Sequence, residues 1–368
     1  MKTLWLLLLS TLFLIGNDKA HTFESSETCK SCHPLIYEEF QSSTHLQAPA
    51  FKDPIHKAVW DKHPKNLNAK QYTCGKCHTP AADNLDDMLT PGKSALPDAN
   101  NPTHAEGISC AYCHRIQSIE HHDASNTNII NPKMHHYYGT RGSEGSPFHT
   151  IDSTSNEHIK NGNICIGCHS HRMNSHGLNV CSTNIENEMD DANCVTCHMP
   201  KVNGSVSNLT KTKKHAYHGF PGTHQGSDLL AAYIRLDAKK TDSGFTVTID
   251  NHSSHALLLH PMRLAVLKTT VLRGNERIIL PDETFARVLG KDGKPAMPWI
   301  ADTTLKDTML KEHEKRTLSF ERKLRKGDRV EVVLGYFLVN PKIVKNLGLS
   351  GNKDATDFHL LKKKVFDF

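Results

Sequence analysis

The chain has 368 residues, of which 11 are cysteine and 26 are histidine, and it carries a formal net charge of +5. This length allows more than one domain. So small a positive charge does not indicate a nucleic-acid-binding protein. Beyond the N-terminus, no apolar stretch approaches the roughly 20 residues that a membrane-spanning helix needs, which argues against an integral membrane protein.

The first 20 residues have the pattern of a signal peptide. Lys2 provides the positive start, and an apolar run follows from Leu4 to Ile15. The run is shorter than a membrane span, and cleavage after Ala20 would leave a mature chain that begins at His21. We therefore expect export to the periplasm, with no stable membrane span after cleavage. Transfer to the cell surface and retention of an uncleaved anchor both stay open.

The most distinctive feature of the sequence is a repeated pattern, Cys-x-x-Cys-His. The five copies occupy residues 29–33, 74–78, 110–114, 165–169 and 194–198; we call them motifs 1 to 5. Together they use ten of the eleven cysteines, which chance cannot produce at this composition. A zinc site needs four tetrahedral ligands and has no use for a histidine after every second cysteine. A thioredoxin-like dithiol needs a single pair in a βαβ setting.

Covalent haem c attachment demands this pattern, because two thiols add to the porphyrin vinyl groups and the adjacent histidine binds iron. The sequence therefore predicts five covalently attached haem c groups. The attachment residues would be Cys29, Cys32, Cys74, Cys77, Cys110, Cys113, Cys165, Cys168, Cys194 and Cys197. The proximal iron ligands would be His33, His78, His114, His169 and His198. The negatively charged haem propionates would offset the small positive charge of the chain.

The chain changes character near Gly226. Residues 21–226 hold all the cysteines and few long apolar runs, so we expect a pentahaem domain of short helices and loops whose core is the haems themselves. One helix is expected over residues 34–45. Residues 227–368 are expected to form an antiparallel, immunoglobulin-like β-sandwich. The predicted fold class is thus α+β.

Alternation of apolar and polar residues marks the strands of the second half. Strands are expected over residues 231–236, 245–250, 317–320 and 330–339. Gly274-Asn275 has the composition of a two-residue hairpin turn, and a second turn is expected at residues 326–328.

The surplus of histidines favours a second histidine, rather than Met134, Met173 or Met199, as the other axial ligand of most haems. Segment 29–48, CKSCHPLIYEEFQSSTHLQA, resembles the multihaem cytochrome c-554 group, the electron acceptors of hydroxylamine oxidoreductase. In that group a histidine at the position of His45 binds a haem iron. Segment 107–114, GISCAYCH, is similar to the third motif of the same group.

Two further segments resemble wider multihaem families. Residues 137–150, YYGTRGSEGSPFHT, are similar to a recurrent stretch in which the residue at His149 is a ligand. CVTCHMP at residues 194–200 resembles the last motif of hydroxylamine oxidoreductase and nitrite reductase relatives. In the HAYHGFPGTH segment that follows, His218 takes the ligand position. These resemblances imply an electron-transfer role and distal ligation by histidine.

The second half resembles sandwich domains appended to multihaem cytochromes, which carry a ligand histidine four residues after an asparagine. Here the segment is 251–255, so His255 is implied as a distal ligand, although Ser254 replaces the usual glycine and His260 lies close by. For the fifth distal ligand we choose His104. His135, His136, His176 and His215 are alternatives, and His104 could also support a ligand without binding iron.

Two classes of function fit these features. The first is an electron carrier between redox partners, such as a quinol-oxidising membrane complex or other cytochromes. The second is an oxidoreductase with one open haem that acts on a small nitrogen or sulfur compound; Arg141, His171 and Arg172 could line its pocket. A Cys-x-x-Cys-Lys motif, the mark of ammonifying nitrite reductases, is absent from the sequence. The sandwich could also serve as a docking module. The odd cysteine, Cys181, is expected to be a small buried residue.

Overall fold

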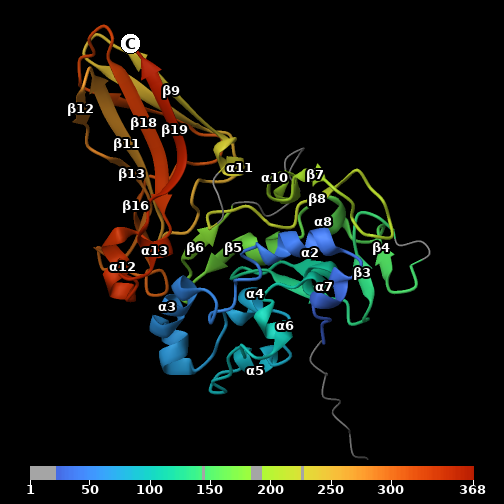
Figure 1. Ribbon diagram of the computed structural model, residues 1–368. Coiled ribbons are helices and arrows are strands. Elements are labelled where there is room, and N and C mark those ends of the chain that lie inside the picture. Colours follow the sequence, from blue (N-terminus) through green and yellow to red (C-terminus); the bar gives the residue numbers. More distant parts are fainter. Residues whose placement is uncertain (1–21, 143–145, 184–192, 225–227) are drawn as a thin grey trace, which may run out of the picture.

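The computed structural model describes residues 22–142, 146–183, 193–224 and 228–368. The predicted signal peptide and the predicted boundary at residue 226 both lie outside these residues. Within them, none of the helices combines the length and the apolar character that crossing a bilayer requires. Figure 1 shows an elongated, strand-rich C-terminal part standing on a part built of short helices and hairpins.

The first part, up to residue 224, consists of short elements. Its helices are α1 (Glu27–Lys30), α2 (Pro34–Gln41), α3 (Pro54–Lys62), the π-helix η1 (Lys65–Ala69), α4 (Gly75–His78), α5 (Leu85–Leu89), α6 (Pro102–Ala105), α7 (Cys110–Arg115), α8 (Glu157–Lys160), α9 (Ile166–His169) and α10 (Cys194–His198). Its strands are β1 (Ile116–Glu120), β2 (Thr127–Ile130), β3 (His136–Tyr138), β4 (Thr150–Asp152), β5 (His171–Met173), β6 (Asn179–Ser182), β7 (Lys201–Asn203) and β8 (Lys214–Ala216). They pair two by two in sequence order, and only β3 and β4 are parallel.

The second part carries α11 (Asp228–Ala231), α12 (Pro341–Leu347), α13 (Lys353–Thr356) and the larger sheets. Its strands are β9 (Ile234–Lys240), β10 (Phe245–Asn251), β11 (Leu264–Arg273), β12 (Glu276–Ile279), β13 (Glu283–Phe285), β14 (Arg287–Lys291), β15 (Lys294–Pro295), β16 (Thr303–Asp307), β17 (Lys315–Phe320), β18 (Arg329–Phe337) and β19 (His359–Asp367). One sheet has the order β17-β10-β9. A second has the order β12-β11-β18-β19, with β13 also on β11, and β14 to β16 form a third.

The first two sheets share one apolar core, as a sandwich requires. Val247 and Ile249 of β10 and Leu267 and Val271 of β11 belong to the same buried cluster. Strand β10 alternates buried and half-buried residues along its whole length, because successive side chains of a strand point to opposite faces. The predicted α+β class with an antiparallel C-terminal sandwich is confirmed.

Most of the expected local elements are present. The hairpin turn at Gly274-Asn275 joins β11 to β12, with Arg273 paired to Glu276 and Gly274 at φ +57°. The helix expected over 34–45 is α2, which ends at Gln41. The strand expected over 231–236 begins only at Ile234, because α11 occupies residues 228–231.

The two parts meet through α3 and the β5–β6 hairpin. Ile55 of α3 packs against the apolar cluster that α12 builds on the second part. The side-chain amide of Asn174, in the β5–β6 turn, donates to the carbonyls of Pro298 (2.8 Å) and Ala301 (2.7 Å). The guanidinium of Arg287 donates to the carbonyl of Asn179 at 2.7 Å. Apolar packing and directional hydrogen bonds together hold the junction.

Candidate haem-binding sites

Each Cys-x-x-Cys-His motif folds as a single helical turn. In motif 2 the backbone N–H of His78 donates to the carbonyl of Cys74 at 2.9 Å, and the same bond closes motifs 1 and 4. A helical turn places residues i and i+3 on one face. The two thiols of each motif therefore point to the same side, with the histidine directly after them.

Four of the five motif histidines are fixed by a backbone carbonyl. The Nδ1 atoms hydrogen-bond as follows: His33 to Val206 O (2.6 Å), His78 to Ala48 O (3.2 Å), His114 to Tyr138 O (2.7 Å) and His198 to Pro221 O (2.7 Å). Because a carbonyl only accepts, each Nδ1 carries the hydrogen and each Nε2 keeps its lone pair. Metal-binding histidines are oriented in this way.

Four motif histidines face a second histidine from a distant part of the chain. The pairs and their ring-centroid separations are His33–His149 (6.2 Å), His45–His169 (6.2 Å), His114–His218 (6.4 Å) and His198–His255 (6.2 Å). The ring planes lie between 13° and 40° of each other. The expected distal residues His45, His149, His218 and His255 are thus each opposite one motif.

The separation in these pairs fits a metal ion between the rings. A metal–imidazole bond is about 2.0–2.1 Å and the ring centre lies about 1.1 Å behind its nitrogen, so two rings on one metal have centroids roughly 6.3 Å apart. Rings in direct contact would be closer. Two of the second histidines are also oriented by carbonyls, His218 by Ala216 (2.7 Å) and His255 by Ala256 (3.0 Å).

Burial keeps these imidazoles in the neutral form that binds metal. Desolvation, with a smaller contribution from neighbouring histidines, lowers the pKa of His45 to about 3 and that of His218 to about 4. Desolvation likewise lowers the pKa of His78 to about 3.

Motif 2 differs from the other four. The ring close to His78 is that of His56, and their centroids are only 4.1 Å apart, too close for a metal between them. Both nitrogens of His56 are engaged, Nδ1 with Ala48 O (3.0 Å) and Nε2 with the hydroxyl of Tyr72 (3.2 Å). No histidine among the described residues faces His78 at the spacing of the other pairs.

The structure does not support His104 as the fifth distal ligand. Its Nδ1 accepts the backbone N–H of Asp98 (2.9 Å) and its Nε2 donates to Asp83 (2.7 Å), so neither nitrogen is available to iron. These bonds tie a loop between α5 and α6, which is a structural role. A buried histidine between two polar partners cannot be told from a ligand by sequence alone.

The four residues named as alternatives to His104 for the fifth distal ligand have other surroundings. His135 is exposed near Glu24, and His136 bonds Thr150. His176 is exposed in the β5–β6 turn. His215 is buried against Glu39.

Of the residues considered for an open pocket, His171 bonds the carbonyl of His122, and Arg172 bonds Ser125 at the surface. Arg141 is exposed.

The five motifs form one connected cluster. Cysteines of different motifs lie close together in three places: Cys29 by Cys110, Cys77 by Cys168, and Cys165 by Cys194. Cys113 is close to both thiols of motif 4. Motif 4 is therefore next to motifs 2, 3 and 5, and motif 1 is next to motif 3.

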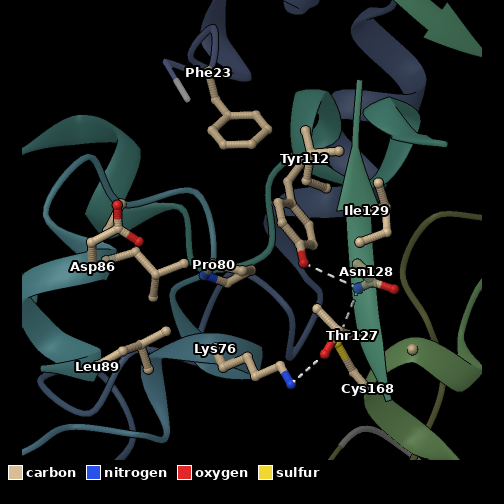
Figure 2. A pocket seen from close by; sticks show the side chains of 14 residues that line it. Phe23, Lys76, Pro80, Asp86, Leu89, Tyr112, Thr127, Asn128, Ile129 and Cys168 are labelled. Carbon is tan, nitrogen blue, oxygen red and sulfur yellow. Dashed lines mark hydrogen bonds between the residues drawn. The ribbon is translucent and has the colours of Figure 1, made fainter. Parts of the chain in front are cut away.

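A pocket of 380 Å³ opens beside Cys168 (Figure 2). Phe23, Tyr112 and Leu89 give it apolar walls. Asn128 crosses it, donating to the hydroxyl of Tyr112 (3.0 Å) and to the thiol of Cys168 (3.5 Å). A mostly apolar pocket with a few placed polar groups, next to a predicted attachment cysteine, suits a flat apolar ring. No cluster of three or more His, Cys, Asp or Glu suited to a bare metal ion occurs in the described part of the chain.

Glu39 supports one of these sites and was not predicted. Its carboxylate accepts from Nε2 of His215 (2.8 Å) and from the backbone N–H of His218 (2.9 Å). It lies on α2, far in sequence from both. No local pattern in the sequence could have joined them, because the contact depends on how α2 packs on the β7–β8 hairpin.

Comparison with known proteins agrees with this geometry. The family described as "Cytochrome c554 and c-prime" matches residues 28–115 and 121–199, which contain all five motifs. The fold is similar to that of a penta-heme cytochrome c552 from Thermochromatium tepidum, at 22% identity and a TM-score of 0.74, over 94% of this chain and 99% of that one. No protein of curated function matches. The chain is thus similar to the family of cytochrome c554 and c-prime over the part that carries its five motifs, and it shares the fold of a penta-heme cytochrome.

Proposed function

We propose that this protein holds five haem c groups, most of them between two histidines, and carries electrons between redox partners outside the cytoplasm. The four facing histidine pairs carry the proposal, since their spacing leaves room for one metal ion each. Haem iron bound in this way supplies one-electron oxidation and reduction.

At four of the sites the residues of the chain favour electron transfer over catalysis. The motif histidine and its distal partner would both bind the iron, which would leave no place on it for a substrate. Backbone carbonyls hold the imidazoles in a fixed orientation, as at His114 and His198. The closeness of cysteines from different motifs places all five sites within one small volume.

Two measurements on the purified holoprotein test this proposal. Intact mass should exceed that of the polypeptide by five haem masses, and a spectroelectrochemical titration should be reversible with five electrons per chain. Fewer haems, or irreversible reduction, would refute it.

The location and the partners are part of the same proposal. Lys2 and the apolar run that follows would direct export, and a quinol-oxidising membrane complex or other cytochromes would exchange electrons with the protein. Expression of the full chain and of a variant without residues 2–20 tests the location. Only the full chain should appear in the periplasm with haem attached.

Motif 2 supports a second candidate, an oxidoreductase that acts on a small nitrogen or sulfur compound. The observation in its favour is that no described histidine faces His78 across a metal-sized gap. Turnover of nitrite, hydroxylamine or sulfur oxyanions, inhibited by carbon monoxide, would support the enzyme. Absence of turnover with all three would leave the carrier as the function.

A further inference from the structure

The junction between the two parts holds a half-buried basic cluster close to motif 2. It consists of His260, Arg263 and Arg287 of the second part, and Cys181 of β6 lies beside both arginines. Arg263 stands just before β11, and Arg287 opens β14. Figure 1 shows β6 close to the lower end of the strand-rich part.

One buried donor in the cluster has no acceptor. One terminal nitrogen of Arg287 donates to the carbonyl of Asn179, whereas its Nε is buried and makes no hydrogen bond. His260 accepts the backbone N–H of Met262 at Nδ1 (3.2 Å), so the hydrogen of the neutral ring is on Nε2. A buried donor left without an acceptor destabilises the fold, and an arginine stays charged at any ordinary pH.

Arg263 adds a half-buried positive charge. Burial lowers its pKa, and the opposing influences come from Cys181, Tyr336 and Asp53. The carboxylate of Asp53 already caps α3 by accepting from Ile55 N and His56 N. Because a positive charge that is withdrawn from water without a partner is destabilising, this cluster calls for an anion.

The cluster is next to motif 2 by two independent routes. His260 lies within electrostatic reach of His78 as well as of Arg263 and Arg287. Across the β5–β6 hairpin, Cys181 is paired with Arg172, and Arg172 lies within electrostatic reach of both Cys74 and Cys77. The anion that the cluster calls for is therefore beside the group attached at Cys74 and Cys77.

We infer that His260, Arg263 and Arg287 form a carboxylate-binding site for the propionates of the haem attached at motif 2. This inference rests on the proposed function, because it needs a haem at that motif. Guanidinium groups bind carboxylates in a planar, bidentate way. The site would make the second part a ligand of the haem and would couple its docking to haem attachment. A free oxyanion from solution has the same chemistry and is the other source to be tested.

Redox titration of the holoprotein tests the site. Arg263→Gln removes a positive charge that favours the reduced state, so the midpoint of one haem of the five should fall. Arg263→Lys keeps the charge and should keep that midpoint close to the original. Arg287→Gln is the second variant, in case Arg263→Gln does not mature. Arg277→Gln, an exposed residue paired with Glu331, is the control and should shift no midpoint.

Two further readings complete the test. The haem that shifts should show nuclear Overhauser contacts to Tyr72, whose ring lies against Gly75 of motif 2. Added phosphate or sulfate should leave the wild-type midpoints unchanged at constant ionic strength; dependence on either, lost in Arg263→Gln, would identify a free oxyanion and overturn the inference. Five reversible haems with no shift in either glutamine variant would also overturn it, while fewer than five haems in the wild type would refute the proposed function instead.

Discussion

His198 and His255 face each other with ring centroids 6.2 Å apart and planes only 13° from parallel. His198 ends motif 5, whereas His255 lies in the loop between β10 and β11 of the sandwich. Asn251, fully buried at the end of β10, holds this loop by donating to the carbonyls of His255 (3.2 Å) and Lys311 (2.8 Å). A metal between the two rings would join the two parts of the chain.

Replacing His255 should open one iron. In His255→Ala the holoprotein should keep five haems, and one of them should become high-spin and bind carbon monoxide. The two parts should stay docked, because Asn174 still bonds the carbonyls of Pro298 and Ala301. The measurement is electron paramagnetic resonance with a carbon monoxide titration. The control is His252→Ala, at an exposed neighbour in the same loop, which should leave every haem low-spin. An unchanged spectrum for His255→Ala would show that His255 does not bind a haem iron.

Glu39 is expected to set the potential of the haem held by His114 and His218. Glu39→Gln removes a negative charge that accepts from His215 and from the backbone of His218. The midpoint of that haem should rise, because the charge favours the oxidised iron. The loss of stability should be on the order of 1–3 kcal/mol, as for hydrogen bonds to a charged group.

Redox titration and thermal unfolding measure the two effects of Glu39→Gln. Glu38→Gln, at the exposed neighbouring position, is the matched control. Equal midpoints in Glu39→Gln and Glu38→Gln would contradict the role of Glu39.

Gly107 is expected to hold His45 in place. It has φ +61°, and a Cβ there would lie 2.4 Å from the carbonyl oxygen of His45. Gly107→Ala should therefore push His45 away from His169, changing the low-spin signal of that haem and destabilising the protein by more than the roughly 1 kcal/mol of left-handed strain. Gly92→Ala is the control, since Gly92 has φ +83° with open space around it. If both variants lose the same stability and keep the same spectrum, the contact is not important.

The buried pair Arg273–Asp328 should make the sandwich sensitive to acid. Hydrogen bonds from the Arg273 guanidinium, the shortest at 2.7 Å, lower the pKa of Asp328 to about 2. In the unfolded chain the pKa of an aspartate is about 3.9. The stability that the pair contributes is therefore complete above about pH 4 and is lost as the pH falls toward 2.

Asp328→Asn should remove on the order of 1–3 kcal/mol at neutral pH. Its unfolding free energy should also vary less than that of the wild type between pH 4 and pH 2. Urea unfolding of the holoprotein at several pH values measures both; parallel pH profiles of the two proteins would argue against the pair.

Sequence alone predicted the features that are local. The Cys-x-x-Cys-His motifs are continuous in the chain, and the strand at 245–250 and the turn at Gly274-Asn275 depend on neighbouring residues. The resemblance to known cytochromes supplied His45, His149, His218 and His255, and the structure places each opposite a motif histidine.

The rest depends on contacts between distant segments. His104 was chosen because it precedes motif 3, but Asp83 and Asp98 occupy its ring nitrogens. Glu39, the carbonyl of Ala48 and the basic cluster at the junction act through packing that no local pattern encodes. Cys181, expected to be a small buried residue, is half-buried beside Arg263 and Arg287, and burial raises the pKa of its thiol.

Near-infrared magnetic circular dichroism of the oxidised holoprotein tests the central claim most directly, because its charge-transfer bands report the axial ligands of each haem iron. The account predicts bis-histidine bands that integrate to at least four haems per chain, one for each facing pair. Bands from histidine–methionine or high-spin haems on two or more of the five irons would contradict it.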